Sequence, residues 1–209
     1  MTQRKPKKPS RKPGPRDRVF EAALTAIAEH GGRGVRMAHI AELAGMSPGH
    51  ILYYFQKKDR ILAETLSWTE AAYARRRRDL LAHSEEAPAQ LLRYIEIYLP
   101  DGPRDPRWVL WLVVYDRAPG DDEISSLTER FEREWHADLA EIVARGIRRG
   151  EFARVDPDEF TERFLVLLGG YGLRVLAERP GATRETTIRR LATLAAGELG
   201  FRLSAVLPD

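Results

Sequence analysis

The sequence predicts an all-α protein, and three observations support this fold class. Apolar residues recur roughly every three to four positions along most of the chain, which is the spacing of one face of a helix. Hardly any segment shows the strict polar and apolar alternation that is typical of a strand. Proline and glycine clusters, such as residues 100–103, divide the chain into helix-length segments. A chain of 209 residues can bury one substantial core, or one small and one larger helical unit that share a junction.

Composition excludes several classes of protein. The chain is 43% hydrophobic and 31% charged, which is typical of a globular protein. No apolar run approaches the roughly 20 residues that span a bilayer, and the basic N-terminus lacks the apolar segment of a secretion signal. The sequence contains no cysteine, so it offers no disulfide framework and no thiolate ligand. We therefore expect a cytoplasmic protein without a membrane partner.

Sequence patterns typical of enzymes are missing as well. The chain contains no HExxH, no GxSxG and no glycine-rich phosphate loop after a strand. Its clustered carboxylates, Glu85-Glu86 and residues 121–123, lie at expected helix starts, where acidic side chains interact favourably with the helix dipole. His136 has no second histidine or carboxylate at metal-ligand spacing. We expect no catalytic residue, no metal site and no cofactor.

The N-terminal residues carry most of the positive charge. Residues 1 to 18 hold eight basic side chains and one acid, a net charge of +7, whereas the whole chain carries only +3 and the remainder is therefore at −4. Residues 1–15 contain four prolines and no apolar residue beyond Met1, so we expect a disordered basic arm. Such an arm either contacts nucleic-acid phosphates or only increases solubility, and both interpretations remain open.

Three short helices are expected after the arm. An amphipathic pattern predicts a helix from Arg16 to His30, ended by the glycines that follow it. A second helix is expected over residues 37–44, where Gly45 breaks it. Ser47 then stands at a good N-cap position, so a third helix begins there and runs to about residue 55. Two short helices joined by a glycine-containing turn, with a supporting helix before them, have the layout of a helix-turn-helix.

The third helix carries residues suited to contact rather than to covalent chemistry. Ile51 and Phe55 lie four residues apart and are expected to pack inward, with Leu52 assigned to packing beside them. The remaining surface carries small or polar-tipped residues, namely Gly49, His50, Tyr53 and Tyr54. With the positive N-terminal end of the helix, these residues suit docking on phosphates and base edges. The alternative is that the tyrosines only cover a small core.

Residues 16–62 resemble the DNA-binding domain of the TetR family of bacterial transcriptional regulators. The resemblance covers the three-helix unit and the start of the fourth helix, including the IAELAGMS turn, the Tyr54-Phe55 pair and the Lys58-Asp59 entry to the next helix. It implies an all-helical homodimer in which each subunit places its third helix in a major groove of double-stranded DNA. It also implies that the larger part, residues 63–209, binds a small ligand and dimerises.

The resemblance assigns DNA contacts position by position. Tyr54 and Lys58 occupy positions that commonly contact phosphates in the family. His50 replaces a frequent threonine or serine and is the best candidate for base readout. Arg36 replaces a capping serine or threonine and is expected to reach a phosphate. The predicted DNA-binding residues are Arg36, Ser47, Gly49, His50, Tyr53, Tyr54 and Lys58.

The second half of the chain reads as a larger helical domain. We expect helices at about residues 59–83, 87–99, 106–117, 123–149, from 157 onward, and 184–206. Residues 75–78 are four successive arginines, and each turns through about 100° relative to the previous one, so they cannot share one face of a helix. We expect one or two of them to be anchored by acidic side chains.

Aromatic residues gather in this second domain. The default interpretation of each is core packing, and the family resemblance favours a ligand cavity for the set. The region from Trp108 to Leu176, with its Trp-rich helix and GIRRGEF segment, also resembles the C-terminal domain of BetI-like members of the family. The effector itself stays unidentified. The predicted pocket residues are Tyr94, Trp108, Trp111, Tyr115, Trp135 and Tyr171.

The last two helices are predicted to form the dimer interface. Gly169, Gly170 and Gly172 interrupt the helix that starts at 157, and each glycine weakens a helix by about 1 kcal/mol relative to alanine. Close helix packing at an interface, or space beside a ligand, would account for them. The final helix carries an apolar stripe, so two such helices from each subunit could form a four-helix bundle.

The sequence therefore predicts a dimeric repressor that a small molecule releases from a palindromic operator. The alternative is a helical small-molecule-binding or protein-interaction module in which DNA binding is secondary or mainly non-specific. Specific operator binding should weaken steeply with salt and should depend on Tyr54 and Lys58, which separates the two hypotheses.

Overall fold

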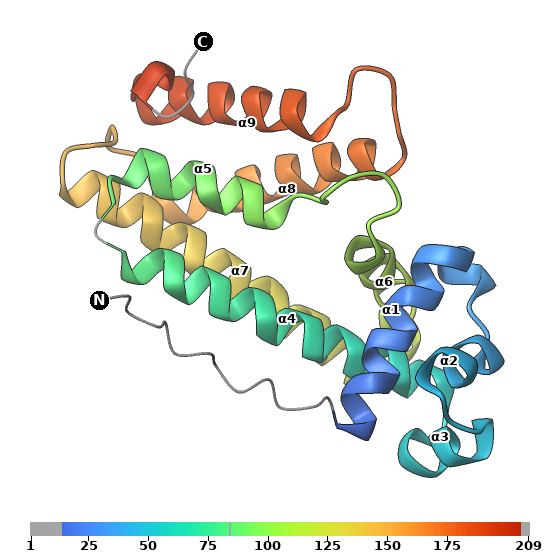
Figure 1. Cartoon of the computed structure of the whole chain (residues 1–209). Coiled ribbons are helices and arrows are strands. Elements are labelled where there is room, and N and C mark those ends of the chain that lie inside the picture. Colours follow the sequence, from blue (N-terminus) through green and yellow to red (C-terminus); the bar gives the residue numbers. More distant parts are fainter. Residues whose placement is uncertain (1–13, 84, 206–209) are drawn as a thin grey trace, which may run out of the picture.

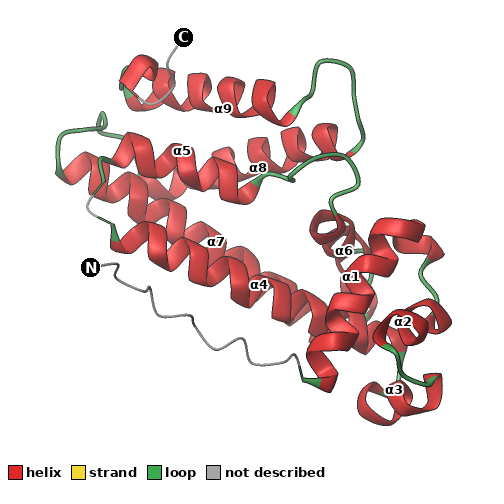
Figure 2. Ribbon diagram, in the orientation of Figure 1, coloured by secondary structure: helices red, strands yellow, loops and turns green. Residues whose placement is uncertain are grey.

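The computed structural model describes residues 14–83 and 85–205, so the predicted basic arm falls almost entirely outside the described residues. Within these ranges the regular structure is helical and contains no strand, as the sequence predicts (Figure 2). Two 3₁₀ turns, η1 (Ala118–Gly120) and η2 (Leu203–Ala205), accompany the α-helices. The α-helices are α1 (Pro15–Gly34), α2 (Met37–Ala44), α3 (Pro48–Phe55), α4 (Lys58–Ala82), α5 (Ala87–Tyr98), α6 (Pro106–Tyr115), α7 (Asp122–Arg148), α8 (Pro157–Leu176) and α9 (Arg184–Leu199).

A small core joins α1, α2 and α3 to the start of α4. The side chains at its centre are at most 1% exposed, namely Val19, Ile27, Ile40, Ile51 and Phe55. The ring of Phe20 packs edge to face on Phe55, with ring centroids 5.8 Å apart, and lies 6.0 Å from the ring of Trp68 on α4. The three-helix unit and the first half of α4 therefore share one set of packing contacts.

The turn between α2 and α3 follows the local signals in the sequence. Gly45 adopts a left-handed conformation with a φ of 63°, and its N–H donates to the carbonyl of Glu42 at 3.1 Å. Ser47 caps α3, since its hydroxyl accepts a hydrogen bond from the N–H of His50 at 3.2 Å. The helix-turn-helix layout predicted from these residues is confirmed.

The first helix is interrupted where the sequence predicts its end. Helical structure resumes and continues to Gly34, but Gly31, directly after His30, is non-helical with a φ of 67° and a ψ of 166°, so α1 consists of a helix that ends at a kink and one further turn. The extra turn packs against α6. Gly32 permits this close approach, because a Cβ at that position would lie 2.1 Å from the Cγ2 atom of Val113.

The predicted end of the last helix is wrong. The sequence extends it to about residue 206, whereas α9 ends at Leu199. Gly200 adopts a left-handed φ of 71° and donates its N–H to the carbonyl of Ala196 at 2.9 Å, which closes the helix. Phe201 then turns back to contact Phe152, with ring centroids 5.5 Å apart. The apolar stripe of the sequence therefore ends at a helix cap.

A second core lies in the C-terminal half, where α5 and α8 pack against α7, α5 also packs against α4, and α9 covers α5 and α8 on the side away from α4 (Figure 1). Tyr94, Leu139, Phe160 and Leu191 are at most 1% exposed there. None of the described helices is long and apolar enough to cross a membrane. The cores are separate, so the molecule has two packed centres connected by shared helices.

Helices α4 and α6 connect the two halves. α4 contributes Leu66 to the first core and Leu80 to the second, so the domain boundary predicted at residue 62 lies within a continuous helix. Leu110 and Val114 of α6 belong to the N-terminal core, although α6 follows α5 in the chain. Any displacement of α6 therefore acts directly on the packing of the helix-turn-helix unit.

Candidate functional site

Helix α3 presents exposed rings beside its buried face. Tyr53 is 81% exposed and Tyr54 is 42% exposed. The imidazole of His50 lies over Tyr54 with ring centroids 5.3 Å apart. Leu52, assigned to packing by the sequence, is instead 41% exposed, because the helix buries only Ile51 and Phe55. The exposed side of α3 is thus wider than the sequence predicts.

The other predicted DNA-binding residues lie in three different settings. Ser47 and Gly49 are at the N-terminal end of α3, and the space in front of Gly49 is open. Arg36 is exposed immediately before α2, and its side chain makes no capping hydrogen bond. Lys58 is half-buried, and its Nζ donates to the carbonyl of Val35 at 3.0 Å. Lys58 therefore fastens the connection between α1 and α2 in addition to any contact with DNA.

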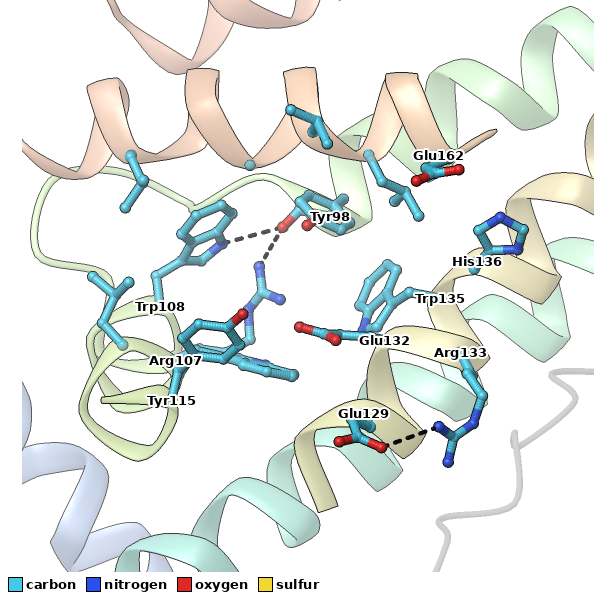
Figure 3. A pocket seen from close by; sticks show the side chains of 16 residues that line it. Tyr98, Arg107, Trp108, Tyr115, Glu129, Glu132, Arg133, Trp135, His136 and Glu162 are labelled. Carbon is cyan, nitrogen blue, oxygen red and sulfur yellow. Dashed lines mark hydrogen bonds and ion pairs between the residues drawn. The ribbon is translucent and has the colours of Figure 1, made fainter. Parts of the chain in front are cut away.

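A cleft of about 770 Å³ opens among α5, α6, α7 and α8 (Figure 3). We call it the aromatic cleft, because its walls contain Tyr98, Trp108, Trp111, Tyr115 and Trp135. Trp108 and Trp135 are at most 9% exposed, whereas Tyr115 is 53% exposed. The cleft has the size typical of sites for small molecules, and it is open to solvent on one side.

Four of the six predicted pocket residues line this cleft, namely Trp108, Trp111, Tyr115 and Trp135. Tyr94 does not: it is fully buried in the second core, and its hydroxyl donates to the carbonyl of Trp135 at 2.7 Å. Tyr171 is also outside the lining, because it packs half-buried against the second core. The sequence shows that these rings belong to one helical domain but not which way each one faces.

One of the glycines of α8 has a packing role at the cleft. A Cβ on Gly172 would lie 2.2 Å from Cη2 of Trp108, so only glycine leaves room for this indole. Gly169 lines the cleft, and a Cβ there would lie 4.0 Å from the hydroxyl of Tyr98. Close packing therefore accounts for Gly172, whereas Gly169 leaves space at the wall of the cleft.

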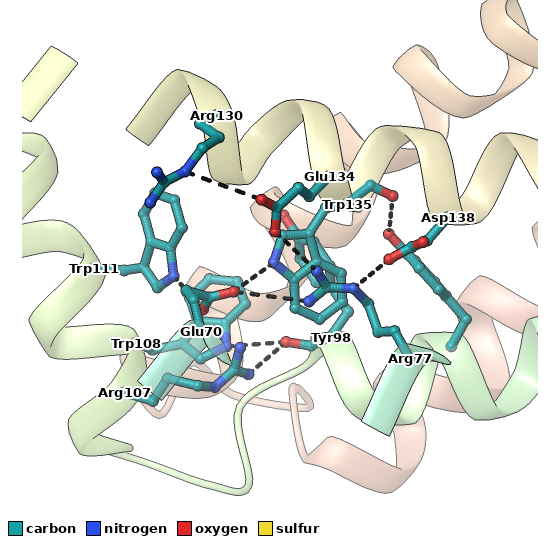
Figure 4. A network of polar contacts seen from close by, with 11 residues as sticks. Glu70, Arg77, Tyr98, Arg107, Trp108, Trp111, Arg130, Glu134, Trp135 and Asp138 are labelled. Carbon is teal, nitrogen blue, oxygen red and sulfur yellow. Dashed lines mark hydrogen bonds and ion pairs between the residues drawn. The ribbon is translucent and has the colours of Figure 1, made fainter. Parts of the chain in front are cut away.

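A buried polar network lies behind the indoles (Figure 4). The indole N–H groups of Trp111 and Trp135 donate to Oε1 and Oε2 of Glu70, at 2.8 and 2.9 Å. Glu70 and Arg77, both on α4, are each 1% exposed. Nε of Arg77 donates to Oδ2 of Asp138 at 2.6 Å. Arg77 is thus the one buried member of the run of arginines at 75–78, anchored by an acid of α7 as the sequence predicts.

Carboxylates and the guanidinium groups of Arg107 and Arg133 complete the walls of the cleft. Glu129 forms an ion pair with Arg133 at 3.6 Å. Glu132 has no ion-pair partner among the described residues, and burial raises its pKa, with the neighbouring Glu129 adding to the effect. Arg107 donates through Nη2 to the carbonyls of Tyr98 and Leu99, at 2.6 and 3.2 Å. Its positive charge therefore stabilises the C-terminal end of α5.

The phenol of Tyr98 remains a neutral hydroxyl. Burial raises its pKa to about 12, although the positive charge of Arg107 opposes this shift. The ring of Tyr98 meets those of Trp108 and Trp135 edge to face, at centroid distances of 5.9 and 5.0 Å. The cleft therefore combines packed aromatic rings with a free carboxylate. Within the described part of the chain, no three acidic, histidine or cysteine side chains are placed to hold a metal ion.

Sequence reasoning missed three residues of this region. Tyr98 could have been found because it belongs to the same group of aromatic residues from which the predicted pocket residues were chosen. Glu132 precedes Trp135 by three residues on α7, so the two belong to neighbouring positions on a helix surface. Glu70 had no sequence signal, because its two indole partners are 41 and 65 residues away in the chain.

Two family descriptions match the chain. Residues 19–65 match the family described as bacterial regulatory proteins of the tetR family. Residues 87–200, more than half of the chain, match the family described as the C-terminal part of BetI-type transcriptional repressors. The two matches coincide with the helix-turn-helix unit and with the part that contains the cleft.

Individual relatives agree with these matches. The chain is 29% identical to the transcriptional regulator BetI of Pseudomonas aeruginosa over 147 residues, which are 63% of this chain and 75% of that protein. A crystal structure of a putative transcriptional regulator from Saccharomonospora viridis in complex with choline is 28% identical, with a TM-score of 0.82 over 88% of this chain and 96% of that one. A TetR regulator from Haloarcula marismortui, 22% identical with a TM-score of 0.77 over 88% and 98%, shares the fold.

These proteins are transcriptional regulators and not enzymes, and members of the family bind DNA and small effectors and typically dimerise. The helix-turn-helix, the all-helical C-terminal half and both family matches agree with one another. The chain belongs to the TetR family of DNA-binding transcriptional regulators, with a BetI-type C-terminal half.

Proposed function

We propose that this regulator is a dimeric cytoplasmic repressor that binds a palindromic operator and is released by a small quaternary ammonium compound. The observation that carries the proposal is the aromatic cleft. Its lining contains five aromatic side chains and the carboxylate of Glu132, which has no ion-pair partner among the described residues. The relative from Saccharomonospora viridis, which was crystallised with choline, supports the same class of ligand.

The walls of the cleft suit a cation that donates few hydrogen bonds. Aromatic faces attract positive charge, and cages of such faces recognise quaternary ammonium groups. The lining carries three glutamates, Glu129, Glu132 and Glu162, against two arginines, and one of these, Arg133, pairs with Glu129 at 3.6 Å. The charge of Arg107 is directed at backbone carbonyls and opposes such a ligand only weakly. A cation that enters this cleft exchanges water for π faces and carboxylates.

The DNA-contacting surface proposed here is the exposed side of α3. Tyr53, Tyr54 and His50 project from it, and Ser47 and Gly49 place the positive end of the helix at the same surface. Such residues suit contacts with phosphates and base edges in a major groove. Arg36 and Lys58 extend the surface with positive charge, as does the basic arm.

The proposed dimer interface consists of α8 and α9. Leu167 of α8 is 40% exposed and Leu194 of α9 is 46% exposed, and neither lines the aromatic cleft. Gly170 of α8 and Gly197 of α9 face open space, so another helix can approach them closely. A two-fold dimer presents its two α3 helices to two half-sites about 34 to 36 Å, or a multiple of this, apart, so a palindromic operator is expected.

Helix α6 offers a route from the cleft to the DNA-contacting surface. Trp108, Trp111 and Tyr115 line the cleft, whereas Val113 of the same helix packs on Gly32 of α1. At the end of α6, Arg117 donates through Nε to Oδ1 of Asp59, in the first turn of α4, at 2.9 Å. A ligand that displaces α6 therefore shifts α1 and α4 together, which alters the separation of the two α3 helices.

Selection of duplexes from a random DNA pool by the full-length protein tests the first half of the proposal. We expect an enriched palindrome whose affinity falls steeply with salt, and calorimetric titration should show that the protein binds choline. DNA binding that depends on salt but not on sequence would contradict the repressor. It would instead favour a small-molecule-binding module in which DNA contact is secondary.

A further inference from the structure

Every indole that lines the aromatic cleft has its N–H group bound elsewhere. Trp108 donates to the carbonyl of Tyr98 at 3.2 Å, and Trp111 and Trp135 donate to the two oxygens of Glu70 (Figure 4). Glu70 does not line the cleft and is 1% exposed on α4. One buried carboxylate therefore holds two rings of the cleft that come from two other helices.

The indoles, rather than Arg77, are the hydrogen-bond donors to Glu70. Nη1 of Arg77 lies 3.7 Å from Oε2 of Glu70, which is beyond hydrogen-bond distance, and makes no hydrogen bond within the described residues. Arg77 donates instead to Asp138, and its guanidinium carbon lies 3.9 Å from the ring centroid of Trp135. An ionised carboxylate only accepts hydrogen bonds, so it matches two indole N–H groups without a competing donor.

This arrangement determines which chemistry the cleft offers to a ligand. An indole whose N–H is bound elsewhere presents its π face, which attracts a cation, and offers no donor to an anion or a carbonyl group. The guanidinium on Trp135 would oppose a second cation near that ring. Three carboxylates surround this guanidinium, those of Glu70, Asp138 and Glu134, at 3.7, 2.6 and 3.8 Å, and they offset its charge.

We infer that Glu70 sets the selectivity of the aromatic cleft for a cation over a neutral compound of the same shape, by orienting Trp111 and Trp135. This inference rests on the proposed function, in which a quaternary ammonium compound occupies the cleft. Glu70 reaches the ligand only through the indoles, so it is a positioning residue. It also connects both rings to α4, the helix that enters the DNA-binding unit.

Two probes and two variants test this inference. The probes are choline and its neutral carbon analogue, 3,3-dimethylbutan-1-ol, and the readout is the ratio of their dissociation constants. Glu70→Gln keeps the length of the side chain but replaces one acceptor oxygen by an amide donor, which cannot accept from an indole. Asp138→Asn is the matched control, because it also removes one negative charge from Arg77 but touches neither indole through a hydrogen bond.

The wild-type protein should prefer choline by about tenfold or more, and Glu70→Gln should abolish most of this preference. Asp138→Asn should retain it to within about threefold. Equal losses in both variants, or a full preference in Glu70→Gln, would overturn the inference. A wild-type protein that binds choline no better than the neutral analogue would overturn the proposed ligand class itself, and the inference with it. The two failures are therefore distinguishable.

A measurement on the wild-type protein covers the case in which Glu70→Gln does not fold. In a ¹⁵N–¹H spectrum, the indole N–H protons of Trp111 and Trp135 should exchange slowly with water, both without and with choline. Trp68, whose indole N–H makes no hydrogen bond within the described residues, provides the comparison. Fast exchange of both buried indoles on addition of choline would contradict a fixed orientation through Glu70.

Discussion

The exposed rings of α3 and the rings of the aromatic cleft are used in opposite ways. His50, Tyr53 and Tyr54 come from one helix and remain in water. Trp108 and Trp135 come from different helices and are at most 9% exposed. DNA is a large polyanion that can be recognised from solvent, whereas attraction between one small cation and a ring strengthens when water is excluded. The two regions therefore differ in burial because their proposed ligands differ in size and charge.

The comparison predicts that DNA binding and choline binding can be lost independently of each other. Substitutions on α3 should change DNA binding and leave choline binding intact, and substitutions in the cleft should do the reverse. The exceptions are the residues of α4, α6 and α7 that pack in the N-terminal core, because their displacement reaches the helix-turn-helix unit. Four experiments address this separation, from the largest expected effect to the smallest.

The largest effect is expected for Ile51→Ala on the buried side of α3. Ile51 is 0% exposed, so the substitution should destabilise the protein by about 2–5 kcal/mol through lost burial and a cavity. Leu52→Ala is the adjacent control, because Leu52 is 41% exposed and should lose far less. Chemical denaturation measures both. Similar losses at the two positions would mean that α3 is oriented differently.

Tyr54→Ala should weaken operator binding by about 1.5–3 kcal/mol, because a hydrogen bond to a charged phosphate is lost. Tyr115→Ala is its counterpart in the cleft, where the tyrosine is also partly exposed. It should weaken choline binding and leave the affinity for operator unchanged in the absence of choline. Fluorescence anisotropy with labelled operator and calorimetry with choline measure the two affinities. Crossed effects would show that the regions are not separate.

Gly172→Ala should displace the indole of Trp108 and so change the shape of the cleft. The new methyl group would lie 2.2 Å from Trp108, and relief of this clash should cost about 1–3 kcal/mol of stability and weaken choline binding. Gly170→Ala, two residues earlier on α8, adds a methyl group away from Trp108 and should leave choline binding intact, while any loss of dimer stability in this variant concerns the interface proposed at Gly170. Both variants are compared at a concentration at which they are dimeric. A harmless Gly172→Ala would exclude the observed packing of Trp108.

The smallest effect concerns the ionisation of Glu132. Partial burial raises the pKa of this carboxyl group, because it removes some of the water around the charge. A bound cation favours the ionised form. Choline affinity should therefore fall as the pH decreases through the pKa of Glu132, and the decrease should begin at a higher pH than for an ordinary glutamate. Calorimetric titrations over about pH 4 to 8 measure it, and Glu132→Gln should flatten the profile. An unchanged profile in the variant would contradict a role of Glu132.

The same carboxyl group makes a prediction for stability with the opposite sign. A raised pKa in the folded state means that the neutral form is favoured by folding, so this contribution is lost as the pH rises through the folded pKa. Glu132→Gln should therefore raise the unfolding temperature slightly at neutral pH without ligand. Below the pKa of an ordinary glutamate the two proteins should be equally stable. The variant would gain stability and lose affinity for the cation.

The sequence predicts the DNA-contacting half better than the cleft, for a physical reason. The helix-turn-helix depends on local signals, such as the cap at Ser47 and the left-handed Gly45, which are readable within a few residues. The direction in which the side chains of Tyr94 and Tyr171 point depends on packing among distant helices, and the structure places both of them outside the lining of the cleft. The extra turn of α1 likewise depends on Val113, which lies 81 positions from Gly32.

Glu70 is the extreme case of this limit. Nothing in its own segment distinguishes it from an ordinary glutamate on a helix, and only the fold brings two indole N–H groups to its oxygens. Arg77 is intermediate, since the run of four arginines predicts an anchored member without telling which one. Local motifs are therefore readable from sequence, whereas partners supplied by other helices are not.

The most direct test of the account is the affinity of the full-length protein for its selected operator, measured with and without saturating choline at fixed ionic strength. The account predicts that choline weakens operator binding by about 5- to 150-fold, a coupling free energy of about 1–3 kcal/mol. Variant Arg117→Ala, which removes the contact between α6 and Asp59, should reduce that coupling. Choline that binds the protein while leaving the operator affinity unchanged would contradict the proposed release.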